Sequence, residues 1–131
     1  MVVVDASLVV NALADDGVVG RRARDMVRRA GDICAPDVVD VETVAALRRR
    51  WLAKSLTASR FAAAVEDLRA LDVQRFPTAL FLRRAYELRA NVTPYDAMYV
   101  ALAEGLDCEL LTADERLAKA AGPRCTIKVV R

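Results

Sequence analysis

The sequence predicts an α/β fold: a single three-layer α/β/α domain over residues 1–131, with a central, mainly parallel sheet of five strands. Short candidate strands alternate with longer helical segments, an order that builds a parallel sheet covered by helices on both faces. The first candidate strand, residues 1–4, is an uninterrupted apolar run, as in strands buried on both faces. A chain of 131 residues with 55% hydrophobic residues suits one core and is too short for two ordinary domains.

The first half of the chain is expected to hold two strands and four helices. Asp5 closes the strand at residues 1–4, and a short helix over residues 7–14 stops at Asp15-Asp16-Gly17. Residues 18–30 form an amphipathic helix, and residues 33–35 form a strand ended by Pro36. The next helix covers residues 39–53, and Thr57 caps another that runs to about residue 70. In the helix at 39–53 the inward side chains are expected to be Val41, Val44, Ala45, Leu47 and Leu52.

The second half continues the alternation. Residues 72–76, 109–112 and 126–130 are the remaining strands, and residues 78–90 and 114–121 are helical. The helix at 93–105 has both ends marked: Thr93 can cap it, Pro94 suits its first position, and Gly105 can end it. Residues 97–103 carry no charge, so this helix is expected to be buried on nearly every side, which makes the carboxylate of Asp96 in its first turn conspicuous.

The composition excludes several kinds of chemistry. Without histidine, the chain has no Ser-His-Asp or Cys-His catalysis and no histidine-based zinc site. The cysteines are Cys34, Cys108 and Cys125, with no Cys-x-x-Cys pair, and are expected to be small core residues rather than a zinc site or disulfides. No apolar run approaches a membrane span and no signal peptide is recognisable, so we expect no membrane contact and a cytoplasmic location.

Acidic side chains stand where a parallel sheet places its sites, near the carboxyl ends of strands. Asp5 ends the first strand, Asp114 follows the fourth, Asp96 opens the helix before that strand, and Glu42 lies near the start of the helix after the second. Each has a structural alternative. Asp5 and Asp114 could cap helices, Thr93 and Asp96 could form a capping box, and Glu42 could favour a helix dipole.

Together, the four acids are harder to explain as caps. Carboxylates converging at one sheet edge would repel each other unless a divalent cation neutralised them. With no histidine and no cysteine ligands expected, an all-oxygen site favours Mg²⁺ or Mn²⁺. Such ions can activate water and stabilise displacement at phosphorus, so the residues predict metal-dependent phosphodiester or phosphotransfer chemistry.

Four segments of the chain resemble the PIN-domain proteins, and their order, spacing and total length resemble the VapC-type ribonuclease toxins of toxin–antitoxin pairs. The segments are VVDAS at residues 3–7, PDVVDVE at 36–42, TPYDAMYVALA at 93–103 and LTADERL at 111–117. The resemblance implies Mg²⁺ or Mn²⁺ held by Asp5, Glu42, Asp96 and Asp114, the acids that would carry catalysis. It implies hydrogen-bond support from Ser7, Asn11 and Thr112, but no fifth acid, because Leu117 is apolar.

The same resemblance implies the partners: an RNA substrate, a cognate VapB-type antitoxin and a second copy of the chain in a homodimer. In the family, a surface like the apolar helical pair at residues 38–56 and 61–71 receives the antitoxin.

Arginine-rich segments are the other candidate binding feature. The net charge is only +2, but most basic residues are Arg, which suits phosphate contact. Two helical groups qualify, with Arg83 and Arg84 as a weaker pair; the groups are Arg21, Arg22, Arg24, Arg28 and Arg29, and Arg48, Arg49 and Arg50. A solvated helix face is the alternative, with Asp25 available to pair with Arg21 or Arg29. Trp51 could stack on a base or pack at a helix end.

Two other functions remain open. The first is a non-catalytic PIN-like module that binds RNA or protein, which would have no need for four acids. The second is a small phosphoacceptor or phosphatase domain. It is disfavoured because the best-placed late lysine, Lys128, lies inside the last expected strand rather than after it.

Overall fold

The computed structural model describes all of residues 1–131 and contains one sheet with five strands, all parallel, in the order β3-β2-β1-β4-β5. The expected fold class is therefore confirmed, and the sheet is wholly rather than mainly parallel. The strands are β1 (Val2–Val4), β2 (Ile33–Pro36), β3 (Val73–Phe76), β4 (Leu110–Thr112) and β5 (Ile127–Val129).

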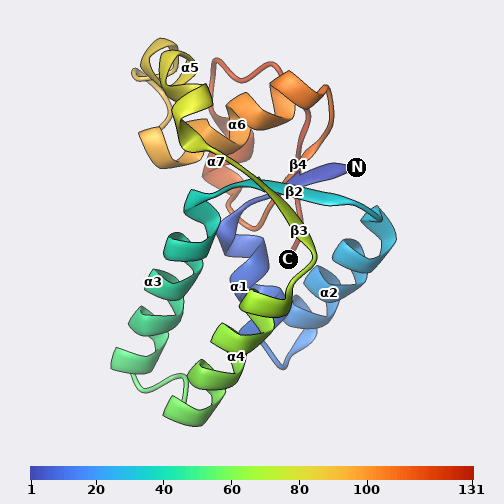
Figure 1. Ribbon diagram of the computed structural model, residues 1–131, viewed down its shortest axis with the longest axis vertical. Coiled ribbons are helices and arrows are strands. Elements are labelled where there is room, and N and C mark those ends of the chain that lie inside the picture. Colours follow the sequence, from blue (N-terminus) through green and yellow to red (C-terminus); the bar gives the residue numbers. More distant parts are fainter.

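Helices cover both faces of this sheet (Figure 1). One face carries the helices that lead from β1 to β2 and from β2 to β3: α1 (Ala6–Ala14), α2 (Val18–Ala30), α3 (Val38–Leu52) and α4 (Ala58–Ala70). The other carries the helices that follow β3: the 3₁₀ turn η1 (Thr78–Phe81), α5 (Leu82–Glu87), α6 (Pro94–Leu106) and α7 (Glu115–Lys119). None of the helices is long and apolar enough to cross a membrane.

The strand order reverses between β1 and β4. From β1 the chain adds β2 and β3 on one side, then crosses to β4 and β5 on the other. In open parallel sheets, the carboxyl ends of the strands at such a reversal border a crevice, because the flanking loops diverge there. Here that position is occupied by Asp5, directly after β1, and by the residues after Thr112 at the end of β4.

The centre of the core explains the apolar runs in the sequence. Val3, Val4, Leu110 and Leu111 are at most 2% exposed, and α6 packs across β1, β2 and β4. All residues of α6 from Ala97 to Ala103 are buried, as the absence of charge predicted. The three cysteines are free thiols, Cys34 buried and the other two partly buried.

Several details differ from the sequence predictions. Val41 and Leu52 were expected to face inward but are 71% and 53% exposed. Leu52 lies at the far end of α3, which extends beyond the sheet (Figure 1), whereas Val41 lies on the solvent side of the first turn of α3. Gly105 does not end α6; the helix continues to Leu106, and Asp107 adopts the left-handed conformation that closes it. Residues 78–90 form η1 and α5 rather than one continuous helix.

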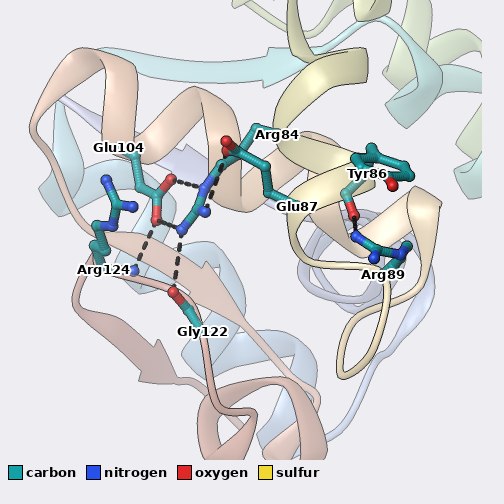
Figure 2. A network of polar contacts seen from close by, with 7 residues as sticks. All are labelled: Arg84, Tyr86, Glu87, Arg89, Glu104, Gly122 and Arg124. Atoms are coloured by element: carbon teal, nitrogen blue, oxygen red, sulfur yellow. Dashed lines mark hydrogen bonds and ion pairs between the residues drawn. The ribbon is translucent and has the colours of Figure 1, made fainter.

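An ionic network fastens α5 to α6 and to the loop before β5 (Figure 2). The guanidinium of Arg84 donates to both carboxylate oxygens of Glu104, at 2.8 and 3.0 Å, and to the carbonyl of Gly122 at 3.1 Å. The backbone N–H of Arg124 donates to the same carboxylate at 2.7 Å. Arg84 is thus a structural residue with few free donors, which removes it from the candidate phosphate contacts.

Candidate active site

The four acids singled out in the sequence line one cavity of about 470 Å³. They come from four separate parts of the fold: Asp5 from the end of β1, Glu42 from the first turns of α3, Asp96 from the first turn of α6, and Asp114 from the residue before α7. The cavity therefore lies at the strand reversal between β1 and β4, where the parallel-sheet rule predicted a site.

Asp5 is the most buried of the four acids, at 4% exposed, and its carboxylate is held by three donors. Its Oδ1 accepts from the Ser7 hydroxyl at 2.6 Å and from the Leu8 N–H at 3.1 Å. Its Oδ2 accepts from the Thr112 hydroxyl. Burial raises the pKa of Asp5, the charge of Asp96 raises it further, and the three hydrogen bonds lower it.

The hydroxyls of Ser7 and Thr112 also fix the loop after β4. Ser7 accepts from the N–H of Ala113 at 3.0 Å, and Thr112 accepts from the N–H of Asp114 at 3.0 Å. Each hydroxyl has one proton, which it gives to Asp5, so each acts as a bridge between the ends of β1 and β4. These bridges hold the loop that carries Asp114 at the end of β1.

Glu42 is held by a residue that sequence reasoning missed. The phenol of Tyr99, only 1% exposed, donates to Glu42 Oε1 at 2.7 Å. Burial raises the pKa of Glu42 and outweighs this hydrogen bond, and the charges of Asp96 and Asp5 add to the rise. Burial also raises the pKa of Tyr99, so the phenol stays protonated as a donor. The available signal was spacing: Tyr99 follows Asp96 by one helical turn and shares its face of α6.

Asp96 couples the acids electrostatically. Its pKa is raised first by burial and then by the charge of Asp114, and its own charge raises the pKa of Asp5 and Glu42. The only ion pair in the group joins Asp114 to the exposed Arg116 at 3.5 Å. Asp5, Glu42 and Asp96 thus form no ion pair, although the charge of Arg49 acts to lower the pKa of Glu42 and that of Arg116 acts to lower the pKa of Asp96.

The structural alternatives for these acids hold in part. Asp5 does cap α1 through Leu8, and Asp114 caps α7 by accepting from the N–H of Arg116 at 2.9 Å. At α6 the cap is the hydroxyl of Thr93, which accepts from the N–H of Asp96 at 3.2 Å. Glu42 lies beyond the first turn of α3, where the acid is Asp40, so the helix-dipole alternative for Glu42 is not supported.

The donor chemistry of the cavity fits a hard divalent cation. Carboxylate oxygens are the ligands that Mg²⁺ and Mn²⁺ prefer, and the unpaired negative charge gives a cation a reason to bind. The site is not preformed, because no three acidic or cysteine side chains are gathered closely enough to make a metal cluster. The residues able to hold a cation are Asp5, Glu42, Asp96 and Asp114.

The cavity also has a basic part, formed by Arg49 and Arg50 near the end of α3. Arg50 donates to Oδ1 of Asn11 at 2.9 Å. Asn11 was expected to support the acids, but its bond to Arg50 gives it a different role. Among the arginines of α2, Arg28 forms an ion pair with Asp25. The expected partners of Asp25 were Arg21 and Arg29, so that prediction was wrong. Trp51 packs against Phe61, with ring centroids 6.4 Å apart.

Comparison with known proteins places the chain among relatives of similar length. The PIN domain family model matches residues 2–123. Ribonuclease VapC9 of Mycobacterium tuberculosis is 42% identical over 130 residues, which cover 99% of this chain and 98% of that protein. Ribonuclease VapC1 of the same species is also 42% identical over 130 residues, covering 98% and 97%.

Solved structures share the fold at lower identity. Mycobacterium tuberculosis VapC20, described as a sarcin-ricin loop cleaving toxin, superposes with a TM-score of 0.71 at 17% identity, covering 89% of this chain and 92% of that one. VapBC2 from Rickettsia felis, bound to a DNA fragment from its promoter, gives a TM-score of 0.69 at 13% identity over 100% of both chains. The family match over nearly the whole chain, with relatives at 42% identity, shows that this protein belongs to the PIN domain family, as the motifs in its sequence predicted.

Proposed function

We propose that the protein is a metal-dependent endoribonuclease that acts as the toxin of a VapBC-type toxin–antitoxin pair. The observation that carries the proposal is the set of four carboxylates from four separate elements, brought into one cavity where only Asp114 forms an ion pair. The family membership and the ribonuclease relatives support the same activity.

The proposed cofactor is Mg²⁺ or Mn²⁺, with Asp5 and Asp96 as its main ligands and Glu42 and Asp114 assisting. A bound ion would activate water and offset negative charge at the phosphate. Ser7 and Thr112 keep Asp5 oriented, and their hydrogen bonds favour its ionised form. Tyr99 orients Glu42 in the same way from the opposite face of the sheet.

The proposed reaction is hydrolysis of an RNA phosphodiester bond with water as nucleophile. Water attack leaves products with a 5′-phosphate and a 3′-hydroxyl. Attack by the ribose 2′-hydroxyl would instead leave a 2′,3′-cyclic phosphate, and this product would contradict the proposal. Mapping the chemistry of the fragment ends therefore tests the route separately from the activity.

The decisive experiment is cleavage of total cellular RNA by the purified chain with Mg²⁺, Mn²⁺ or EDTA. Asp96→Asn keeps the side-chain shape but removes the charge that couples the other acids. We expect discrete fragments from the wild type that vanish with EDTA and with Asp96→Asn. Asp67→Asn is the matched control, because Asp67 is an exposed acid on α4 outside the cavity, and this variant should cleave normally.

The alternative is a non-catalytic PIN-like module that binds RNA or protein. If folded wild type and Asp96→Asn leave RNA equally intact under every metal condition, this alternative takes precedence. Calorimetric titration with Mn²⁺ gives a second criterion, because a scaffold without a metal site should bind the ion no better than Asp96→Asn does.

The proposed partners are an RNA substrate, a VapB-type antitoxin and a second copy of the chain. Among the solved structures with this fold, one is the VapBC2 assembly of Rickettsia felis and another is a DNA-bound VapBC from Salmonella typhimurium. Co-expression with a cognate VapB-type antitoxin should suppress cleavage by the wild type. Light scattering of the purified chain would reveal whether it forms a homodimer.

A further inference from the structure

The cavity has opposite charges at its two ends. The acids lie at the sheet edge, whereas Arg50 lines the same cavity about two turns further along α3 than Glu42. At about 1.5 Å per helical residue, Arg50 is about 12 Å beyond Glu42 along α3, and Asn11 is about 9 Å beyond Asp5 along α1. Since α1 and α3 pack side by side and both line the cavity, the cavity forms one trough from the acids to Arg50.

Arg50 is held in this trough without being neutralised. The only hydrogen bond of its guanidinium is the one to Asn11 Oδ1 at 2.9 Å, and it forms no ion pair with any acid. Asn11 is itself only 9% exposed, so its amide is fixed by the packing of α1. A neutral acceptor orients a guanidinium but leaves its charge and its remaining N–H donors available.

The end of α3 is also fixed. Ser55 donates its backbone N–H and its hydroxyl to the carbonyl of Arg50, at 2.9 and 3.1 Å. The N–H of Lys54 donates to the carbonyl of Trp51 at 3.0 Å, so the two backbone bonds form a Schellman closure with Lys54 in the left-handed conformation. Arg50 therefore has a fixed backbone and a fixed side-chain direction, as a binding residue requires.

We propose that Arg50, oriented by Asn11, binds an RNA backbone phosphate that flanks the bond to be cut. This inference rests on the proposed ribonuclease function and assigns its substrate contact. A guanidinium with free paired donors matches the geometry of a phosphodiester, and its distance from the acids places it on a neighbouring phosphate rather than on the scissile one. Arg50 differs in this respect from the arginines of α2, because none of them lines the cavity that holds the acids.

Binding is measured apart from cleavage. A short fluorescein-labelled single-stranded RNA is titrated with protein in EDTA at several NaCl concentrations, and anisotropy gives the Kd. Arg50→Gln should raise the Kd about tenfold and reduce the salt dependence by about one counterion. Arg69→Gln is the charge-matched control, because Arg69 is an exposed arginine on α4 that pairs with Glu66. Equal weakening by both variants would overturn the assignment, because only total charge would then matter.

Cleavage kinetics in Mn²⁺ test whether the phosphate bound by Arg50 flanks the bond that is cut. A flanking contact is made equally in the ground and transition states, so Arg50→Gln should raise KM with kcat within about twofold of the wild type. A fall in kcat with unchanged KM would overturn the flanking position. Wild-type protein that binds RNA through Arg50 but cuts nothing would refute the ribonuclease proposal and leave the phosphate contact standing.

Asn11 is a positioning residue that orients Arg50, so its role is tested by combining a change at Asn11 with a change at Arg50. Asn11→Ala should weaken RNA binding about threefold in the wild type and have no effect in Arg50→Gln, because its role runs through Arg50. Additive losses would contradict this. Arg50→Lys keeps the charge without the planar fork and should recover part of the affinity, which separates phosphate binding from any loss of folding.

Discussion

Two threonines offer an internal test of how hydroxyl groups contribute to this fold. Thr43 and Thr112 are both 0% exposed. The Thr43 hydroxyl has no hydrogen-bond partner, whereas that of Thr112 donates to Asp5 and accepts from the N–H of Asp114. Valine replaces the hydroxyl with a methyl group and keeps the branched shape. The same substitution should therefore change stability in opposite directions at the two positions.

The magnitudes follow from hydrogen-bond satisfaction. A buried polar group without a partner costs about 1–3 kcal/mol, so Thr43→Val should raise the free energy of unfolding by about 1–2 kcal/mol. A hydrogen bond to a charged group contributes about 1.5–3 kcal/mol, so Thr112→Val should lower it by roughly that amount. An unfolding entropy of about 2.1 cal/mol/K per residue converts 1.5 kcal/mol to about 5 °C in Tm for a chain of this length.

The assay is urea unfolding in EDTA, followed by far-ultraviolet circular dichroism, with calorimetric Tm values beside it. Helix propensities of Thr and Val are similar, so the backbone contributes little to the difference at Thr43. If Thr43→Val is neutral or destabilising, the hydroxyl has a partner such as a buried water, and the reasoning is refuted. If Thr112→Val is as stable as the wild type, Asp5 does not depend on that hydroxyl.

Three further substitutions test other parts of the structure. Lys54→Gly should raise the free energy of unfolding by about 0.5–1 kcal/mol, because Lys54 has φ of 62° and glycine is not strained there; unchanged urea midpoints would contradict this. Arg84→Gln should lower it by about 1–3 kcal/mol, since Glu104 would lose its bidentate partner, whereas Arg83→Gln should have little effect. Asp96→Asn should stabilise the protein in EDTA. Since the folded state raises the pKa of Asp96 above 3.8, its ionisation disfavours folding, so the advantage of the variant should grow as the pH rises from that value towards neutrality. A difference that stays constant with pH would rule out this cause.

The order of strands and helices was predictable because each boundary has a local physical signal. Buried strands are short apolar runs, and Thr57 and Thr93 cap α4 and α6 as expected. The errors arose where tertiary structure decides. Val41 and Leu52 match an apolar stripe, but Leu52 lies where α3 extends past the sheet and Val41 lies on the exposed side of its first turn. Of the side chains expected to face inward, only Leu47 belongs to the smaller core cluster.

The acids of the site were predictable, but the residues that orient them were not. Asp5 and Asp114 follow strands, so the rule for parallel sheets placed them at one edge. The hydrogen bond from Tyr99 to Glu42 spans 57 positions in the chain, and the one from Arg50 to Asn11 spans 39. Such contacts depend on how α3 packs against α6 and α1, which no local pattern specifies.

Capping and metal binding are compatible roles for these acids. Asp5 caps α1 through Oδ1, while its Oδ2 accepts one hydrogen bond, from the Thr112 hydroxyl, and keeps a free lone pair. Asp114 caps α7 through Oδ1 alone. Capping does not require charge, because Ser, Thr or Asn caps a helix about as well. Burial and neighbouring carboxylates raise the pKa of Asp5, Glu42 and Asp96, which is a cost to the fold that neutral caps would avoid. The proposed cation accounts for the charge of these acids, whereas capping accounts only for where the carboxylates stand.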